Sequence, residues 1–296
     1  MTVSIRPIDP VQRAFFAGEV SGIDITRPLT HADAAAISAG MDRFGVLVFR
    51  DQHFTDETQL AFSRNFGALE QATGDIVQGH ERRLSMDVND ISNLDRNNQL
   101  LARDDRRRLF GLGNRLWHSD SSFKVVSAKY SLLSARRIPS AGGNTEFADM
   151  RAAYDALDDD TKAECENLIC EHSQLFSRSV LGFTAFTDEE RVKFAPVQQR
   201  LVRRHPVTAR RSLFLASHAG AILGWPVPEA RAFLRDLTEH ATQRKFVYAH
   251  AWRQWDLVMW DNRVTMHRAR PFNNAEVRDM HRTTVACEVS TMEQAA

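Results

Sequence analysis

The segment Leu116-Trp117-His118-Ser119-Asp120-Ser121-Ser122-Phe123 decides how this chain and its fold are interpreted. If the segment is extended, residues two apart point to the same face, so the imidazole of His118 and the carboxylate of Asp120 can reach one metal ion. On a helix the two side chains would diverge. Trp117 and Phe123 are typical of a strand that lines a core. The segment therefore predicts a strand beside a metal site, and a strand with a polar edge is the alternative.

A second His-x-Asp pair, His31-Ala32-Asp33, shows how weak this motif is by itself in a chain with 11 histidines. The second pair follows Thr30 and opens an alanine-rich segment, which predicts a helix capped by Thr30. Asp33 then lies in the first turn, where the helix dipole favours a negative charge. We therefore interpret His31 and Asp33 as structural.

The first pair gains support from a distant histidine in the segment Trp260-Asp261-Asn262-Arg263-Val264-Thr265-Met266-His267. The run 256–260 predicts a strand, and the turn after it would direct His267 into the mouth of a barrel. Two imidazoles and one carboxylate can occupy one face of an iron octahedron and leave three positions for a chelating co-substrate and dioxygen. The set His118, Asp120 and His267 therefore indicates an oxygenase, although a lone histidine in such a place is more often structural.

The composition limits the classes of function. Lys plus Arg and Asp plus Glu both number 38, so the formal net charge is zero, which argues against nucleic acid or an anionic membrane as the partner. The chain contains no apolar run as long as the ~18 residues of a membrane-spanning helix, and its first residues lack the pattern of a signal peptide. The three cysteines form no CxxC pair, so we expect a cytoplasmic protein with reduced thiols. A homo-oligomer is compatible with these features.

The chain has no repeat, low-complexity tract or linker, so we expect one domain over residues 1–296. Short strands are predicted mainly in the second half, with helices inserted between them. This pattern predicts a mainly β fold, a double-stranded β-helix (jelly roll) with inserted helices. The expected strands are 46–50, 88–93, 130–138, 212–216, 245–250, 256–260 and 283–289, and the expected helices begin at His31 and Asp56 and cover 149–157, 159–170 and 228–241.

The segment 94–113 is rich in charged residues and poor in core residues, and it directly precedes the His-x-Asp motif. Loops of this length are usually functional lids or disordered, and we favour an active-site lid over about 94–113. Within it, Arg106-Arg107-Arg108 is interpreted as a solvated face. Several histidines and tryptophans outside the motifs are interpreted as structural or packing residues, namely His205, His218, His250, His281, Trp252 and Trp255.

A co-substrate such as 2-oxoglutarate needs a cation for its far carboxylate, and arginine suits this role because its planar fork donates two hydrogen bonds. Arg278 lies eleven residues after His267, and Arg282 lies fifteen after it. Thr145 follows Gly142-Gly143, and its hydroxyl could share the same carboxylate.

Together these residues resemble the taurine dioxygenase-like family of iron(II)/2-oxoglutarate oxygenases and, within it, the 2,4-dichlorophenoxyacetate (phenoxyalkanoate) dioxygenases. The resemblance extends from about Ala17 to Ala286 and is most specific in the segments 116–123, 147–157, 240–248 and 256–263. It implies a small aryloxy acid and dioxygen as substrates, Fe(II) as the metal, 2-oxoglutarate as co-substrate and ascorbate as a supporting reductant. The carbon between the ether oxygen and the carboxylate would be hydroxylated, giving a phenol and glyoxylate together with succinate and CO₂.

The resemblance also implies a role for each matching residue. His118, Asp120 and His267 would bind the iron, and Thr145 and Arg278 would bind the far carboxylate of 2-oxoglutarate. Arg282 and Asn114 fall where the family contacts the prime substrate.

The chain departs from the family in places that leave the substrate open. Thr208-Ala209-Arg210 replaces a Thr-Gly-Arg turn, and alanine is less at ease than glycine at positive φ, so a turn of different shape is expected. The segments 66–81 and 94–113 also match the herbicide enzymes poorly. A taurine/alkylsulfonate-type or other small-acid dioxygenase is therefore the alternative within the class. A metal-dependent hydrolase and a non-catalytic jelly-roll binding protein are the alternatives outside it.

Overall fold

The computed structural model describes residues 3–72 and 82–294, so the part of the 66–81 segment from residue 73 onward lies outside the described residues. The N-terminal part comprises β1 (Ser4–Pro7), β2 (Gly18–Ser21), α1 (His31–Phe44), β3 (Val46–Phe49) and α2 (Asp56–Arg64). Both expected caps are present. The Thr30 hydroxyl accepts a hydrogen bond from the Asp33 amide, and Thr55 forms a capping box with Thr58. The second His-x-Asp pair, His31 and Asp33, is a decoy for the metal motif; this decoy pair is the start of a helix, as predicted.

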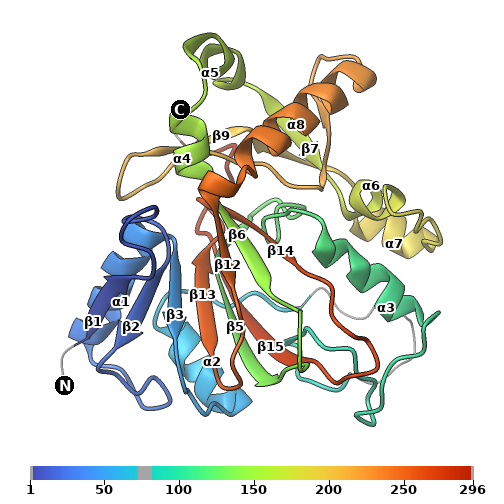
Figure 1. Cartoon of the computed structure of the whole chain (residues 1–296). Helices are drawn as coiled ribbons and strands as arrows, with labels where there is room; N and C mark the ends of the chain where they lie inside the picture. The colour runs from blue at the N-terminus through green and yellow to red at the C-terminus, as the bar shows by residue number, and fades with distance from the viewer. Residues whose placement is uncertain (1–2, 73–81, 295–296) are drawn as a thin grey trace.

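Sheets dominate the rest of the chain, with helices between the strands (Figure 1). The largest sheet has the order β1-β2-β3-β13-β5-β15-β4, and a three-stranded sheet has the order β12-β6-β14. Two smaller sheets have the orders β11-β7-β8 and β10-β9. The strands not yet given are β4 (Asn89–Asp90), β5 (Ala128–Arg137), β6 (Thr145–Asp149), β7 (Ile169–His172), β8 (Val197–Arg200), β9 (Val202–Arg204), β10 (Arg211–Leu213), β11 (Ala219–Ile222), β12 (Val247–His250), β13 (Leu257–Asp261), β14 (Thr265–Ala269) and β15 (Asp279–Ala286).

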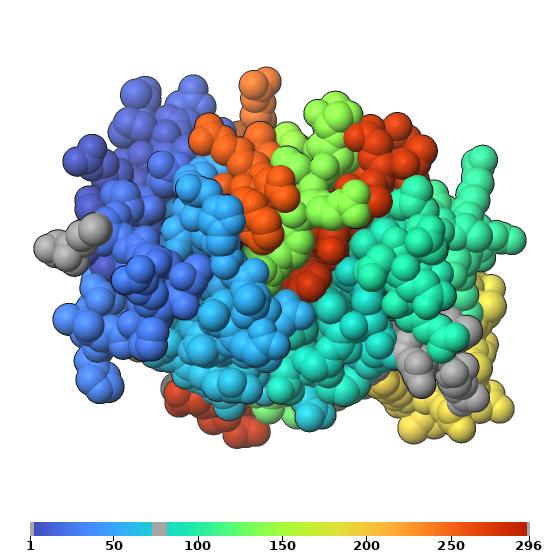
Figure 2. All heavy atoms as spheres, turned by 90° about the horizontal axis from the view of Figure 1, so that it is seen from below, coloured from blue at the N-terminus to red at the C-terminus, as the bar shows by residue number. Residues whose placement is uncertain are grey.

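The remaining helices lie between these strands. In Figure 1, α8 lies at the top of the molecule and α3 lies at its right-hand side. Figure 2 shows the opposite end hollowed near its centre, where red atoms of the C-terminal part lie between the blue and teal segments. The helical elements are α3 (Arg106–Gly111), η1 (Leu112–Arg115), α4 (Met150–Asp155), α5 (Asp159–Cys165), α6 (Gln174–Ser179), α7 (Asp188–Lys193), α8 (Val227–Ala241) and η2 (Arg244–Phe246).

The two-residue alternation of β13 divides the core into layers. Leu257 and Met259 pack with α1 and α2 on one face of the large sheet. Val258 and Trp260 pack on the other face, against Phe147 of the three-stranded sheet. A strand buried on both faces is apolar throughout, which explains why this run is a continuous apolar sequence. The space between the large and three-stranded sheets is therefore the interior of the fold.

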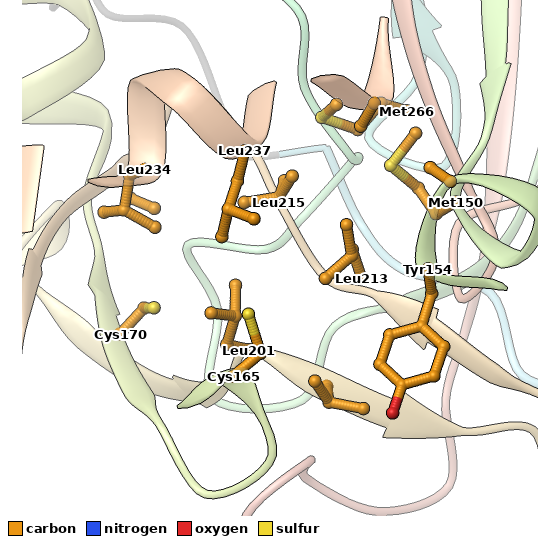
Figure 3. Packing of buried hydrophobic residues seen from close by; sticks show 14 of the residues in the cluster. Met150, Tyr154, Cys165, Cys170, Leu201, Leu213, Leu215, Leu234, Leu237 and Met266 are labelled. Carbon is orange, nitrogen blue, oxygen red and sulfur yellow. The ribbon is translucent and has the colours of Figure 1, made fainter. Parts of the chain in front are cut away.

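A third cluster lies on the outer side of the three-stranded sheet; it contains Met266 of β14, which lies beside Met150, and the leucines of α8 (Figure 3). Cys165 and Cys170 are both fully buried in this cluster. Burial raises the pKa of each thiol to about 12, so neither is a thiolate at neutral pH. Both cysteines are therefore core residues.

Several predicted boundaries were wrong. The helix expected over 159–170 ends at Cys165, and β7 follows, because Ile169–His172 pairs with both β8 and β11. The strand expected over 88–93 is reduced to Asn89–Asp90, although the amides of Ile91 and Asn93 still donate to the carbonyls of Met280 and Arg278. The last strand begins at Asp279, four residues before the predicted start.

The segment 94–113 is not one exposed loop. It contains α3 and the start of η1, and its residues from 105 onward are mostly half-buried. Arg106 is not part of a solvated face: it donates two hydrogen bonds to the Glu190 carboxylate, at 2.8 and 2.6 Å, which docks α3 on α7. The turn at Ala209 keeps the left-handed conformation, with φ of 56°, so the expected change of shape is not seen in its φ angle. Over residues 3–72 and 82–294, no helix is both long enough and apolar enough to cross a bilayer.

Candidate metal centre and its cavity

His118, Asp120 and His267 lie together in the interior between the large and three-stranded sheets. The backbones of His118 and His267 exchange two hydrogen bonds, of 3.0 and 2.8 Å, and their rings lie 4.2 Å apart. Each Nε2 atom lies 3.8 Å from a different oxygen of the Asp120 carboxylate. One donor atom from each residue falls within 4.8 Å of the other two, and all three residues are buried. Cis ligands of a first-row metal are about 3 Å apart, so a small contraction would bring these three atoms onto one ion.

Local strand geometry explains why His267 takes part. Met266 points to the outer cluster, so the next residue on β14 points inward. The His267 ring packs against Trp260 of β13, with ring centroids 4.7 Å apart, and against Phe147 of β6. Among the described residues, its Nδ1 atom is buried without a hydrogen-bond partner.

The protonation states of the two imidazoles favour metal binding. Nδ1 of His118 lies 2.8 Å from the Leu116 carbonyl, so this nitrogen carries the proton and Nε2 keeps its lone pair. Burial lowers the pKa of His118, and burial together with the neighbouring His118 ring lowers that of His267 well below its ordinary value. Both rings are therefore neutral at pH 7, as metal ligation requires.

The Asp120 carboxylate is ionised and held in place. Burial alone would raise its pKa, but the charge of Arg282, assisted by the hydrogen bond from the Ser131 hydroxyl, lowers that pKa to about 2. Ser131 of β5 donates to Oδ2 at 2.7 Å, and Arg282 of β15 donates to Oδ1 at 2.5 Å. The side chain of Asn262 accepts from the Asp120 amide and donates to Ser131. Sequence reasoning missed Ser131 and did not assign Asn262 a role, although Asn262 lies inside the quoted C-terminal motif.

A cavity of about 310 Å³ opens beside this centre. Ten arginines line it against two acidic residues, Asp90 and Asp95, and several apolar side chains, among them Phe110 and Phe272, contribute to its walls. The three candidate ligands do not line the cavity. Arg282 does line it and also contacts Asp120, so this arginine connects the cavity with the candidate metal centre. A strongly basic wall with apolar patches is suited to an organic anion.

Arg278 is a buried guanidinium in this wall. Its Nη1 donates to the Ile91 carbonyl at 3.3 Å, and its Cζ lies 5.7 Å from the ring centre of Phe272. No described carboxylate lies within ion-pair distance, and burial lowers its pKa to about 10. An arginine placed this way lacks a counter-anion and could hold the far carboxylate of a dicarboxylic acid.

The Gly142-Gly143 turn precedes Thr145 and lies close to the segment that follows β14. Both residues have positive φ, 76° and 70°, and a Cβ atom at Gly142 would lie 2.6 Å from the Pro271 carbonyl oxygen. Thr145 begins the next strand and is buried. Its hydroxyl accepts from the indole N–H of Trp252 at 3.0 Å and can still donate its own proton, although Thr145 is not among the residues that line the cavity. Trp252, interpreted as a packing residue, thus also orients Thr145.

The other predicted residues occupy different positions relative to the cavity. Asn114 of η1 is half-buried and lines it. His218 does not line it, but its ring lies 6.0 Å from that of His118. Arg178 of α6 is buried, lines the cavity, and was not predicted, since no motif or spacing distinguishes it.

Comparison with known proteins gives a consistent result. The model of the family "Taurine catabolism dioxygenase TauD, TfdA family" matches residues 4–284. The alpha-ketoglutarate-dependent 2,4-dichlorophenoxyacetate dioxygenase of Cupriavidus pinatubonensis is 43% identical over 96% of this chain and 98% of its own. The (S)-phenoxypropionate/alpha-ketoglutarate-dioxygenase of Sphingobium herbicidovorans is 38% identical over 95% and 94%.

Among solved structures, that of AAD-2 in complex with Mn(II) and N-oxalylglycine superposes with a TM-score of 0.90. Its sequence is 55% identical to this one, and the match covers 99% of this chain and 100% of that chain.

Proposed function

The chain belongs to the taurine catabolism dioxygenase TauD, TfdA family, and from that premise we propose that it cleaves aryloxyalkanoates as an Fe(II)- and 2-oxoglutarate-dependent dioxygenase. The observation that supports this most is the combination of a buried His/Asp/His set with Arg278, a buried arginine without a described ion-pair partner in the wall of the adjacent basic cavity. We also propose that the facing sheets form a double-stranded β-helix, that residues 1–296 are one domain, and that segment 94–113 is its lid.

Iron and 2-oxoglutarate, when bound, would supply the chemistry by which dioxygen oxidises the substrate. The protein would hold the iron with His118, Asp120 and His267, which offer two neutral nitrogens and one anionic oxygen. Ser131 and Asn262 would keep the Asp120 carboxylate in one orientation, because both are bonded to it or to its backbone.

Arg278 would bind the far carboxylate of 2-oxoglutarate, with the Thr145 hydroxyl as a second donor. Arg282 contacts Asp120 and lines the cavity, and its Nε is buried without a partner among the described residues. We propose that it orients Asp120 and, with Asn114, contacts the prime substrate. The carbon between the ether oxygen and the carboxylate would then face the metal, and positioning of this kind accounts for much of an enzyme's rate.

The substrate class follows from the relatives and from the cavity. Two relatives that match nearly the whole chain are named for 2,4-dichlorophenoxyacetate and (S)-phenoxypropionate. A wall that combines arginines with Phe110, Phe272 and aliphatic side chains suits an acid that carries an aromatic ring. An alkylsulfonate is the second candidate, since the basic wall suits any small organic anion, and an alkylsulfatase of Acinetobacter baylyi is 27% identical to this chain.

The test is succinate and phenol release from 2-oxoglutarate, Fe(II) and ascorbate with phenoxyacetates, phenoxypropionates and alkylsulfonates. We expect both products with an aryloxy acid. Succinate formation stimulated only by sulfonates would overturn the proposal of an aryloxy acid substrate. No stimulation by any of these acids would overturn both substrate candidates, the aryloxy acid and the alkylsulfonate. Arg278→Ala separates an oxygenase from a hydrolase, because a hydrolase has no use for 2-oxoglutarate. An unchanged 2-oxoglutarate KM in that variant would contradict the proposed role of Arg278.

A further inference from the structure

Arg178 of α6 is a second buried guanidinium without a counter-anion in the cavity wall. It is only 4% exposed. Of its three nitrogens, Nη1 donates to the Ser177 hydroxyl at 3.1 Å, whereas Nε is buried with no hydrogen-bond partner among the described residues. No described carboxylate lies within ion-pair distance, and burial lowers its pKa to about 10.

The surroundings of Arg178 hold it in this position. Its Cζ lies 4.4 Å from the centre of the Phe110 ring of α3, a cation–π contact. Gly113 of η1 allows the close approach, because a Cβ atom there would lie 2.2 Å from the guanidinium carbon. Two elements of the 94–113 segment thus pack directly on this side chain.

Five arginines of the described chain are buried, and their partners differ. Arg151 and Arg263 pair with Asp149 and Asp261. The other three, Arg178, Arg203 and Arg278, have no described carboxylate within ion-pair distance, and of these only Arg178 and Arg278 line the cavity. A buried unpaired charge is costly, so two such charges facing one cavity indicate two anionic groups in the ligands.

Arg178 also lies close to the candidate metal centre. The neighbouring Ser177 hydroxyl lies 2.9 Å from Nδ1 of His218, whose ring lies 6.0 Å from that of His118. The positive charge of Arg178 is among the influences that lower the pKa of His118. An anion bound to Arg178 would therefore be near the reacting position.

Gln174 supplies a second, independent observation. It precedes Arg178 by four residues, so both side chains lie on the same face of α6. Gln174 also lines the cavity, and its buried Oε1 atom has no hydrogen-bond partner among the described residues. This face of α6 therefore presents a charged fork and an amide, both incompletely bonded, to the same space.

We propose that Arg178, with Gln174 beside it, binds the carboxylate of the prime substrate and sets the preference of the enzyme for acids. Arg278 would take the far carboxylate of 2-oxoglutarate, and Arg282 would be engaged mainly by Asp120, at 2.5 Å. Recognition of the substrate carboxylate then comes from α6, between α3 and His218, as well as from β15. This inference rests on the proposed function and names the residue that selects its substrate class.

The test compares an aryloxyacetate with the matching uncharged aryloxyacetamide, used as an inhibitor, in the iron-loaded enzyme. Loss of a bidentate charge-assisted contact is expected to raise the KM for the acid roughly 10- to 100-fold in Arg178→Gln. The affinity for the amide and the KM for 2-oxoglutarate should stay within about twofold. Arg203→Gln is the matched control, because Arg203 is also buried, also stacks on a phenylalanine and also lacks a carboxylate, but lies away from the cavity.

Gln174→Glu keeps the inference testable if Arg178→Gln does not fold. It places a carboxylate four residues before Arg178, where an internal ion pair can form. We expect this variant to melt at a higher temperature than the wild type and yet to bind the acid at least about tenfold more weakly. A purely structural role for Arg178 does not couple higher stability to weaker binding of the acid.

The outcomes separate the two proposals. If the wild type releases phenol and both α6 variants keep its KM for the acid, the role of Arg178 is overturned and the proposed function stands. If the wild type neither binds nor converts any aryloxy acid, the proposed substrate fails and this inference fails with it.

Discussion

Replacement of Ser131 by alanine should weaken the metal centre without touching a metal ligand. Ser131 is fully buried on β5, donates to Oδ2 of Asp120 at 2.7 Å and accepts from Nδ2 of Asn262 at 2.9 Å. The Ser131→Ala substitution removes a hydrogen bond to a charged group, about 1.5–3 kcal/mol, and leaves an amide N–H of Asn262 unpaired, about 1–3 kcal/mol. The free energy of unfolding should therefore fall by roughly 2.5–6 kcal/mol.

The same substitution should also act on metal binding. Loss of a group that orients a ligand typically lowers metal affinity about 10- to 100-fold. Mn(II) affinity measured by equilibrium dialysis, together with urea unfolding of the metal-free protein, gives both numbers.

Ser134→Ala is the matched control for Ser131→Ala. Ser134 is buried on the same strand, but its hydroxyl donates to Gln59 of α2, on the other face of the large sheet. This variant should lose stability and keep its metal affinity. Equal metal affinities in the two variants would refute the argument that Ser131 orients Asp120.

Two further predictions concern pH and the turn at Ala209. His281 lies 2.5 Å from Asp56 and 3.2 Å from Asp279; burial alone would lower its pKa, but these two carboxylates raise it above the ordinary 6.5. Its contribution to stability is thus complete below about pH 6.5 and is lost as the pH rises through the raised pKa. The difference in free energy of unfolding between wild type and His281→Gln, measured in urea, should therefore narrow from pH 6 to pH 9. A constant difference would contradict this prediction. Ala209→Gly should raise the free energy of unfolding by about 0.5–1 kcal/mol. A left-handed alanine costs about 1–2 kcal/mol, and glycine removes this cost but offsets part of the gain because it loses more chain entropy on folding. A destabilised variant would argue against the left-handed turn.

Local signals predicted the elements whose stability is local. Thr30 and Thr55 cap their helices through bonds to residues three positions ahead, and such bonds are visible in a sequence. The apolar run of β13 is also a local signal, because a continuous apolar sequence of this length is typical of a strand buried on both faces. The His118, Asp120 and His267 set was also predictable, because the two-residue spacing and the turn before His267 are short-range features.

The errors arose where distant contacts decide the structure. The expected helix 159–170 gives way to β7 because two other strands supply partners for Ile169–His172. The 94–113 segment contains a helix docked by Arg106 on Glu190, 84 residues away in the chain. Arg178 lies 60 residues from His118 in sequence, and only the packing of α6 beside η1 brings it to the cavity. No pattern within a single segment could reveal these contacts.

The same measurement of Mn(II) binding tests the central claim most directly, when it is applied to the candidate ligands and to the decoy pair. The wild type should bind one ion per chain, and His267→Ala should lose this binding, because two ligands remain of a three-ligand set. His31→Ala should bind as the wild type does, since His31 begins α1 and contributes to no metal cluster among the described residues. Unchanged binding in His267→Ala, or lost binding in His31→Ala, would contradict the account.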